Sequence, residues 1–241
     1  MKLLAFAALF VVGVTLSPPI EAKCARNVAV PVILTTRDTK LPDDGGVLVG
    51  WDASMDDATG EMSADPSDQP TWTATEGQGK SQTKLVLTRV ALAPGLSLYK
   101  VTGTGDITLA GKKPLGTFHH DAKAAANTMA APALTSMVFV KQKAVRWAER
   151  TATAHFKSAP PEAAAAVIVY SVTAKGNTPI GFATLPDTHD TLTEVDTFHD
   201  RGHCDVILDA ARPPNPGEKI VVAWVDSFGR LSPTSKPVTT H

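Results

Sequence analysis

Apolar residues recur at every second position along much of this 241-residue sequence, and this spacing constrains the fold more than any other feature. In residues 27–37, for example, Val28, Val30, Val32 and Leu34 would all lie on one face of an extended strand. Similar short segments, separated by turns rich in proline and glycine, are residues 47–51, 84–88, 96–102, 106–110, 151–157, 165–173, 180–184, 191–196, 204–210, 218–226 and 236–240. The pattern predicts an all-β fold of antiparallel sandwiches.

Residues 113–132 interrupt the strand pattern. Asp121 could cap a short helix over residues 122–127, because alanine favours helix and Pro132 would end it. The same alanine-rich stretch could instead connect two domains. Both interpretations place a domain boundary near residue 130, so we expect two β-sandwich domains in tandem, over residues 23–130 and 131–241.

The first 22 residues have the character of a signal peptide. Lys2 is followed by an apolar run over residues 3–16, and residues 17–22 resemble a cleavage region, so we expect the mature chain to start near Lys23. Spanning a bilayer needs about 20 apolar residues, which this run does not reach. Lys23 stands where lipidation of Cys24 would need a small residue. We therefore expect a soluble protein of the periplasm or the extracellular medium.

The two cysteines, Cys24 and Cys204, are expected to pair in an oxidising compartment. An intramolecular disulfide would close almost the whole mature chain, a loop for which the chain-entropy model gives about 4 to 5 kcal/mol. Pairing between two chains is the alternative. The wide spacing lacks the C-x-x-C arrangement of redox-active pairs, so we interpret the bond as structural.

The charge balance and the motifs exclude several function classes. With 23 basic and 24 acidic residues, the formal net charge of −1 provides no overall field to attract nucleic acid or an anionic membrane. Residues 77–81 (GQGKS) resemble a phosphate loop, but Ala74 stands where its first glycine is needed, so we interpret them as a hairpin tip. The sequence contains neither a G-x-S-x-G nucleophile elbow nor an H-E-x-x-H motif.

Three histidines, His189, His199 and His203, are the candidate metal ligands. They fall within fifteen residues and among several aspartates, and imidazole suits copper and zinc. On one extended strand His199 and His203 would be roughly 13 Å apart, too far to share an ion, so only a loop at Gly202 could bring them together. The alternative is solvated loop histidines.

Residues 41–79 carry many carboxylates and neither lysine nor arginine. Residues 52–56 supply oxygens at alternate positions, as a calcium loop does, but Asp57 replaces its turn glycine and Ser63 its bidentate glutamate. A long solvated acidic loop is the alternative that we favour.

The tryptophans allow two interpretations. On strands with an alternating pattern we expect Trp51, Trp72, Trp147 and Trp224 to lie in the core. An exposed pair could instead form a platform for sugar rings or peptide, and Trp72, in a polar run, is the best candidate for exposure.

Two segments of the second half carry a resemblance to a known family. Residues 156–161 (FKSAPP) followed by 167–172 (VIVYSV) resemble the B strand, turn and C strand of a fibronectin type III or related immunoglobulin-like domain. Residues 222–233 (VAWVDSFGRLSP) resemble its F strand, tight turn and approach to the G strand. The resemblance covers about residues 135 to 240.

The resemblance has two departures. His155 or Phe156 occupies the usual tryptophan position of the B strand, and Glu218 with Lys219 stands where a core tyrosine is expected. The first half resembles a more divergent immunoglobulin-like unit, best seen at the proline-glycine turn before Leu96.

The resemblance implies an exported, non-enzymatic binding or structural module of the cell envelope or extracellular space, with a protein or carbohydrate as its ligand. The competing hypothesis is a metal-dependent envelope protein, either a copper or zinc carrier or a small hydrolase, that uses His189, His199 and His203.

Overall fold

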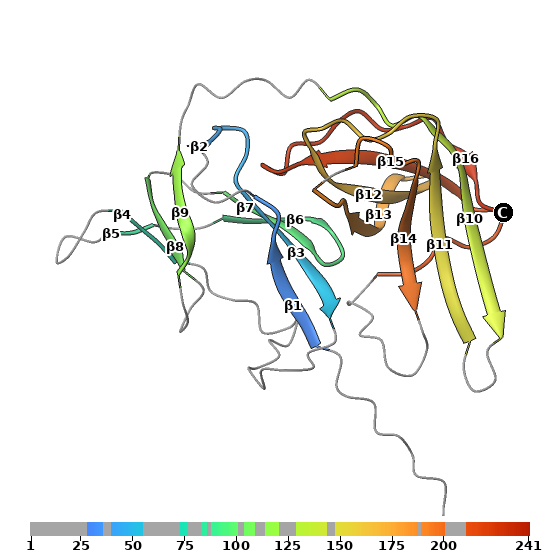
Figure 1. Cartoon of the computed structure of the whole chain (residues 1–241), viewed down its shortest axis with the longest axis horizontal. Coiled ribbons are helices and arrows are strands. Elements are labelled where there is room, and N and C mark those ends of the chain that lie inside the picture. The colour runs from blue at the N-terminus through green and yellow to red at the C-terminus, as the bar shows by residue number, and fades with distance from the viewer. Residues whose placement is uncertain are drawn as a thin grey trace, which may run out of the picture.

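The computed structural model describes residues 28–35, 40–54, 73–76, 83–85, 88–100, 104–108, 114–120, 129–143, 148–187, 189–200 and 211–241 (Figure 1). Every regular element in these residues is a β-strand, which confirms the prediction of an all-β fold. The strands are β1 (Val28–Ile33), β2 (Lys40–Leu41), β3 (Val47–Ser54), β4 (Thr73–Glu76), β5 (Thr83–Leu85), β6 (Thr88–Ala93), β7 (Leu96–Lys100), β8 (Thr104–Thr108), β9 (Pro114–His120), β10 (Leu134–Lys143), β11 (Ala148–Phe156), β12 (Ala164–Thr173), β13 (Gly176–Thr184), β14 (Glu194–Asp200), β15 (Lys219–Asp226) and β16 (Val238–Thr239). Within these same ranges, no helix is long and apolar enough to cross a bilayer.

These strands form four sheets, whose strand orders are β1-β3-β7-β6, β2-β9-β8-β4-β5, β10-β11-β14 and β13-β12-β15-β16. We call them the amino-terminal, five-stranded, three-stranded and central sheets. Neighbouring strands are antiparallel, apart from the short parallel pair β2–β9. In Figure 1 the three-stranded sheet lies at the right and the five-stranded sheet at the left.

The two middle strands of the central sheet, β12 and β15, are buried on both faces. Along β12, Val167 and Val169 pack into one core, whereas Ala166 and Ile168 pack into another. The first core, which we call the inner core, lies between the central and three-stranded sheets and contains Met137, Phe156 and Trp224. Because side chains alternate across a strand, one continuous apolar run serves both cores.

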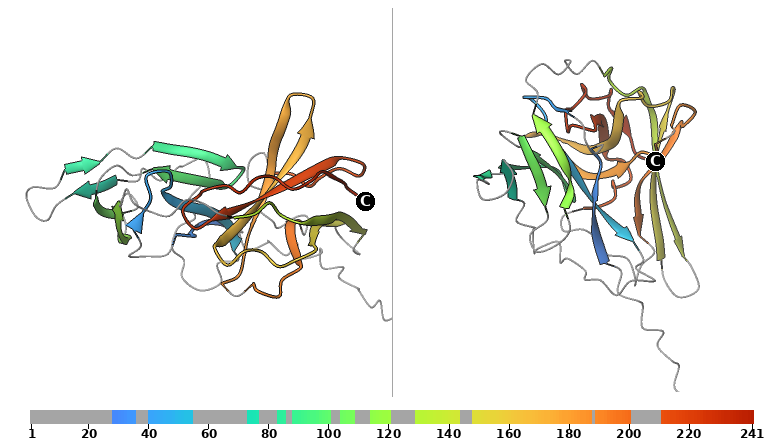
Figure 2. Two further views of the ribbon diagram at one scale, coloured as in Figure 1. Left: turned by 90° about the horizontal axis from the view of Figure 1, so that it is seen from above. Right: turned by 60° about the vertical axis from the view of Figure 1, so that its left-hand side comes forward.

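The second core joins the two halves of the chain, and we call this contact the seam. Leu48 of β3 and Leu96 of β7, in the amino-terminal sheet, pack with Ile168 and Val225 of the central sheet. The two views in Figure 2 show the amino-terminal strands beside the central sheet. The seam thus turns three of the sheets into a layered stack.

Polar contacts extend the seam beyond its apolar core. The Gly46 N–H donates to the Phe228 carbonyl at 3.0 Å, and the Thr35 hydroxyl donates to the Ser227 carbonyl at 2.5 Å. Thr35 also accepts a hydrogen bond from the Leu48 N–H at 2.7 Å. The turn that follows β15 is therefore held by two segments of the first half.

Several predicted strands are confirmed, including residues 165–173 as β12 and residues 218–226 as β15. The strands β2, β4, β9 and β10 were not predicted, and of β6 only Thr88 fell in a predicted segment. In β10 the run Met137 to Val140 is apolar at every position, so it shows no two-residue period, although Met137 is buried and Val140 is 38% exposed. The predicted strand at 204–210 and the possible helix at 122–127 lie outside the described residues.

The expectation of a long acidic loop over residues 41–79 is wrong in part. β3 runs to Ser54 and β4 covers residues 73–76, so residues near both ends of the segment lie in paired strands. Asp52 and Ser54, the first oxygens of the possible calcium loop, lie on β3 opposite Val30 and Val28. Residue 56, which completes the calcium pattern, is outside the described residues.

Trp224 confirms the core interpretation for one tryptophan, because it is 2% exposed and its ring lies 4.7 Å from that of Phe156, centroid to centroid. Trp51 lies on β3. Trp72, Trp147, the two cysteines and the leader over residues 1–22 fall outside the described residues.

Candidate functional site

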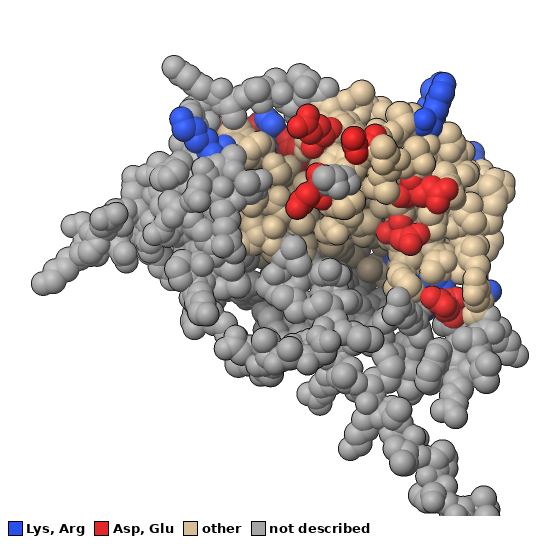
Figure 3. Space-filling view, in the orientation of Figure 1, with Lys and Arg blue, Asp and Glu red and all other residues tan. Residues whose placement is uncertain are grey.

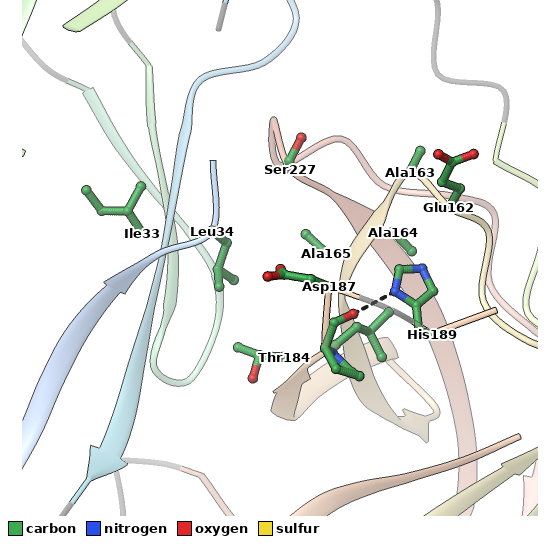
Figure 4. Close-up of a pocket in the computed structure, with 12 residues that line it drawn as sticks. Ile33, Leu34, Glu162, Ala163, Ala164, Ala165, Thr184, Asp187, His189 and Ser227 are labelled. Carbon is green, nitrogen blue, oxygen red and sulfur yellow. Dashed lines mark hydrogen bonds between the residues drawn. The ribbon is translucent and has the colours of Figure 1, made fainter. Parts of the chain in front are cut away.

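A pocket of about 510 Å³ lies at the seam, where the amino-terminal sheet faces the loops of the central sheet (Figure 4). Its lining is Ile33, Leu34, Glu162, Ala163, Ala164, Ala165, Thr184, Leu185, Pro186, Asp187, His189 and Ser227. The volume is in the range of small-ligand sites, which occur preferentially where domains meet.

Short side chains create the space. Residues 163–165, around the start of β12, are all alanines, and the methyl groups of Ala163 and Ala165 leave room that larger side chains would fill. Leu34, directly after β1, forms an apolar wall on the other side. The Leu185 N–H donates to the Ala165 carbonyl at 2.9 Å, which holds the connection between β13 and β14 beside the alanines.

The buried ring of His189 holds the connection between β13 and β14 in place beside the pocket. The imidazole is 7% exposed, and its Nδ1 and Nε2 lie 2.8 Å and 2.9 Å from the carbonyl oxygens of Pro186 and Pro161. Each ring nitrogen therefore faces a backbone acceptor, and a neutral ring can donate to only one of the two. The ring links the β13–β14 connection to the turn before β12, and in this arrangement neither nitrogen is free to bind a metal.

The pocket is lined by two carboxylates, Glu162 and Asp187. Both side chains are exposed, and within the described part of the chain neither makes a hydrogen bond or an ion pair. Figure 4 shows the Asp187 carboxylate pointing towards Leu34 and Glu162 on the opposite side of the pocket. Among the described residues, the hydroxyls of Thr184 and Ser227 are the other side-chain polar groups of the lining besides His189. These groups can bind a ligand.

The structure does not bring the two described candidate metal ligands together. His189 precedes β14, whereas His199 lies near its far end, roughly 16 Å along the strand from Glu194. His199 Nε2 lies 3.0 Å from Glu149 Oε1 on β11. His203 is outside the described residues, and within those residues no group of three histidine, cysteine, aspartate or glutamate side chains could hold a metal ion. The copper or zinc site remains a prediction.

A second polar cluster surrounds Glu218, immediately before β15. The Arg212 guanidinium donates to both carboxylate oxygens, at 2.9 Å and 2.6 Å, the Asn215 N–H donates at 2.7 Å, and the Ser171 hydroxyl also donates. The hydrogen bonds from Arg212, supported by those from Ser171 and Asn215, outweigh partial burial and lower the pKa of Glu218 from 4.5 to about 2. The cluster ties residues 212–218 to β12, which is a structural role.

The sequence had singled out only part of these clusters. Asp187 is one of the aspartates that lie near the histidines in the sequence, and Glu218 is a departure from the family pattern. The pocket itself combines four segments that are far apart in the chain, around residues 33, 163, 186 and 227, and no local pattern connects them.

No family model matches the chain, and no curated protein matches it. Among solved structures, it is similar to the glycoside hydrolase domain of Endo-D from Streptococcus pneumoniae R6. The likeness has 15% identity and a TM-score of 0.28, and it covers 89% of this chain but 44% of that chain. The chain thus spans less than half the length of that structure, and the likeness is too weak to support a fold or a function.

Proposed function

We propose that this protein is an exported, non-enzymatic binding or structural module of the cell envelope or extracellular space, with a protein or carbohydrate ligand. Its two halves would be immunoglobulin-like units, and its binding site would be the pocket at the seam. The pocket is the observation that carries the binding role, because it is concave, of ligand size and built from loops of a rigid β scaffold.

Strand order supports the immunoglobulin-like assignment of the second half. The strands β10, β11 and β14 would be A, B and E of a fibronectin type III domain, and β13, β12, β15 and β16 would be C′, C, F and G. The end of β11 and the middle of β12 coincide with the predicted B and C strands, and β15 with the predicted F strand. One shared core between the two sheets is also what a sandwich requires.

A blocking variant tests the binding role. Thr184, at the end of β13, is exposed and lines the pocket, so Thr184→Trp would fill the pocket without burying a polar group. Thr178→Trp, at an exposed position on the same strand that does not line the pocket, is the matched control. We expect a ligand identified on peptide and glycan arrays to lose at least about tenfold in affinity with Thr184→Trp and to keep its affinity with Thr178→Trp.

Two results would contradict the proposal: no ligand on either array, or equal binding by both variants. Export is tested separately. Fractionation and amino-terminal sequencing should give a mature chain starting near Lys23, and mass spectrometry without reduction should show the Cys24–Cys204 bond. An uncleaved cytosolic product would contradict export.

A further inference from the structure

The charge of the pocket indicates which class of ligand it would take. Among the described residues that line it there are two carboxylates but neither lysine nor arginine, and within the same part of the chain the two carboxylates have no partner. Concave sites lined by charges of one sign concentrate counter-charged ligands, because the protein walls focus the field. A cationic group is therefore favoured and an anionic group is disfavoured.

The wider surface has the same sign. In Figure 3 acidic side chains lie across the middle of the described face, whereas lysine and arginine side chains lie mainly at its margins. Asp190, which is exposed and three residues beyond Asp187, adds a further negative charge near the pocket. Arg230, a cation of the seam, is engaged by Asp226, with Nε 2.7 Å from Oδ2.

The apolar part of the pocket lining indicates what shape a cationic ligand should have. Leu34, Ala163 and Ala165 offer a surface for a hydrocarbon stem, while the carboxylates lie on opposite sides. A flexible alkyl chain that ends in an ammonium group fits both features, because such side chains lay their stems on apolar surface and keep the charged head in a polar environment. A hydrated metal ion would gain nothing from the apolar wall.

We propose that the seam pocket binds an alkylammonium group, either the side chain of a lysine in a peptide or a free aliphatic amine. This inference rests on the proposed function, since it assigns a ligand class to the same pocket. Glu162 and Asp187 provide the charge, and Leu34 with Ala163 and Ala165 contacts the stem.

The experiment is an NMR titration of the full mature protein with three probes: acetyl-Gly-Lys-Gly-amide, its norleucine analogue, and cadaverine. We expect the lysine peptide or cadaverine to shift the amide signals of residues 163–165 and 184–187. Whichever cation binds identifies the source as peptide or free amine. The norleucine peptide should bind at least about tenfold more weakly, and raising the salt from about 0.02 M to about 0.5 M should weaken cation binding.

Variants separate charge from shape. The double variant Glu162→Gln/Asp187→Asn should lose at least about tenfold in affinity for the cation, because both charges are removed while the side-chain volumes stay nearly the same. Asp190→Asn removes an exposed charge that does not line the pocket, and we expect less than about a twofold change.

The outcomes distinguish the two proposals. Equal binding of the lysine and norleucine peptides, or full affinity in the double variant, would overturn the cationic class and leave the pocket as a binding site. The cationic class would also be overturned if neither cation shifted the amide signals of the pocket but a ligand from the arrays did. If no ligand of any class shifts them, the proposed function fails as well.

Discussion

The two faces of the central sheet are buried in different ways. The inner face packs against the three-stranded sheet through large side chains, among them Trp224, Phe156 and Met137. The other face meets the amino-terminal sheet through a smaller core, of which Leu48, Ile168 and Val225 are members. At the seam, hydrogen bonds to the carbonyls of Ser227 and Phe228 supplement this smaller core.

The difference teaches how one sheet can join two halves of a chain. Stability from apolar burial scales with the area removed from water, so the inner core should contribute more than the seam. The seam instead depends on close approach of backbone segments, which tolerates little change of shape. We therefore expect the inner core to respond most to lost volume and the seam to respond most to added volume.

Adjacent residues of β15 allow the largest test, because Trp224 belongs to the inner core and Val225 to the seam core. We expect Trp224→Ala to lower the free energy of unfolding by about 3 to 5 kcal/mol, since it removes a buried ring that contacts Phe156. Val225→Ala should cost about 2 kcal/mol, because less volume is lost. Urea unfolding followed by circular dichroism measures both, and a larger loss for Val225→Ala would reverse the comparison.

The second prediction adds volume at the seam. Gly229 has φ of +77°, and an added Cβ would lie 2.5 Å from Leu98 Cδ1, on a side chain that is only 3% exposed. Gly217 has φ of +79° but nothing within 4 Å of an added Cβ. We expect Gly229→Ala to cost about 1 to 2 kcal/mol more than Gly217→Ala, because the backbone strain is shared and only the overlap differs.

The double variant Gly229→Ala/Leu98→Ala checks the cause of that difference in urea unfolding. Removing the Leu98 side chain should make the effect of Gly229→Ala equal to that of Gly217→Ala, as a double-mutant cycle would report. Equal losses for the two single glycine variants would show that the seam yields to added volume.

The sequence predicted strands best where one face is apolar and the other polar, as in the predicted segment 151–157, of which residues 151–156 lie in β11. It also predicted β12 and β15, although their apolar runs are nearly continuous. The structure gives a fuller reason, because both faces of those strands are covered. β9 and β10 were missed, because glycine and proline in β9 and consecutive apolar residues in β10 hide the two-residue period.

The site was less predictable than the fold. His189 and His199 are only ten positions apart in the sequence. However, most of β14 lies between them, and an extended strand advances by about 3.3 Å per residue, so the two side chains end far apart. The pocket depends instead on the turn at Ser227 meeting the segment after β1, where Thr35 donates to the Ser227 carbonyl across 192 positions of the chain. Periodicity describes which face of a strand is buried and carries no information on which distant segment covers it.

Lowering the pH tests the contribution of Glu218 to stability. This residue lies immediately before β15, at the end that is remote from the seam. A carboxylate with its pKa lowered from 4.5 to about 2 contributes stability that is present above pH 4.5 and is lost as the pH falls towards 2. We expect Glu218→Gln to cost about 1 kcal/mol at pH 6, less than the full shift would give because Arg212 is partly exposed. The deficit relative to the parent should shrink as the pH falls from 4.5 to 2.5 in urea unfolding.

Glu162→Gln is the control for this pH profile, because Glu162 is exposed and has no partner among the described residues. Its stability should follow that of the parent at every pH. A deficit of Glu218→Gln that stays constant over the same range would mean that the cluster stabilises the fold through packing and not through the charge.

The smallest effect is expected at the salt bridge across the seam. Arg230 Nη1 lies 3.8 Å from Asp44 Oδ1, and the Asp44 side chain is 64% exposed, so water and salt screen the pair. We expect Asp44→Asn to cost about 0.3 kcal/mol at low salt and nothing measurable at about 1 M salt, with Asp190→Asn, an exposed carboxylate elsewhere, as the control. If urea unfolding showed a loss above about 1 kcal/mol that persists in salt, charge would contribute to the seam as strongly as shape does, and the contrast between the two faces would have to be drawn differently.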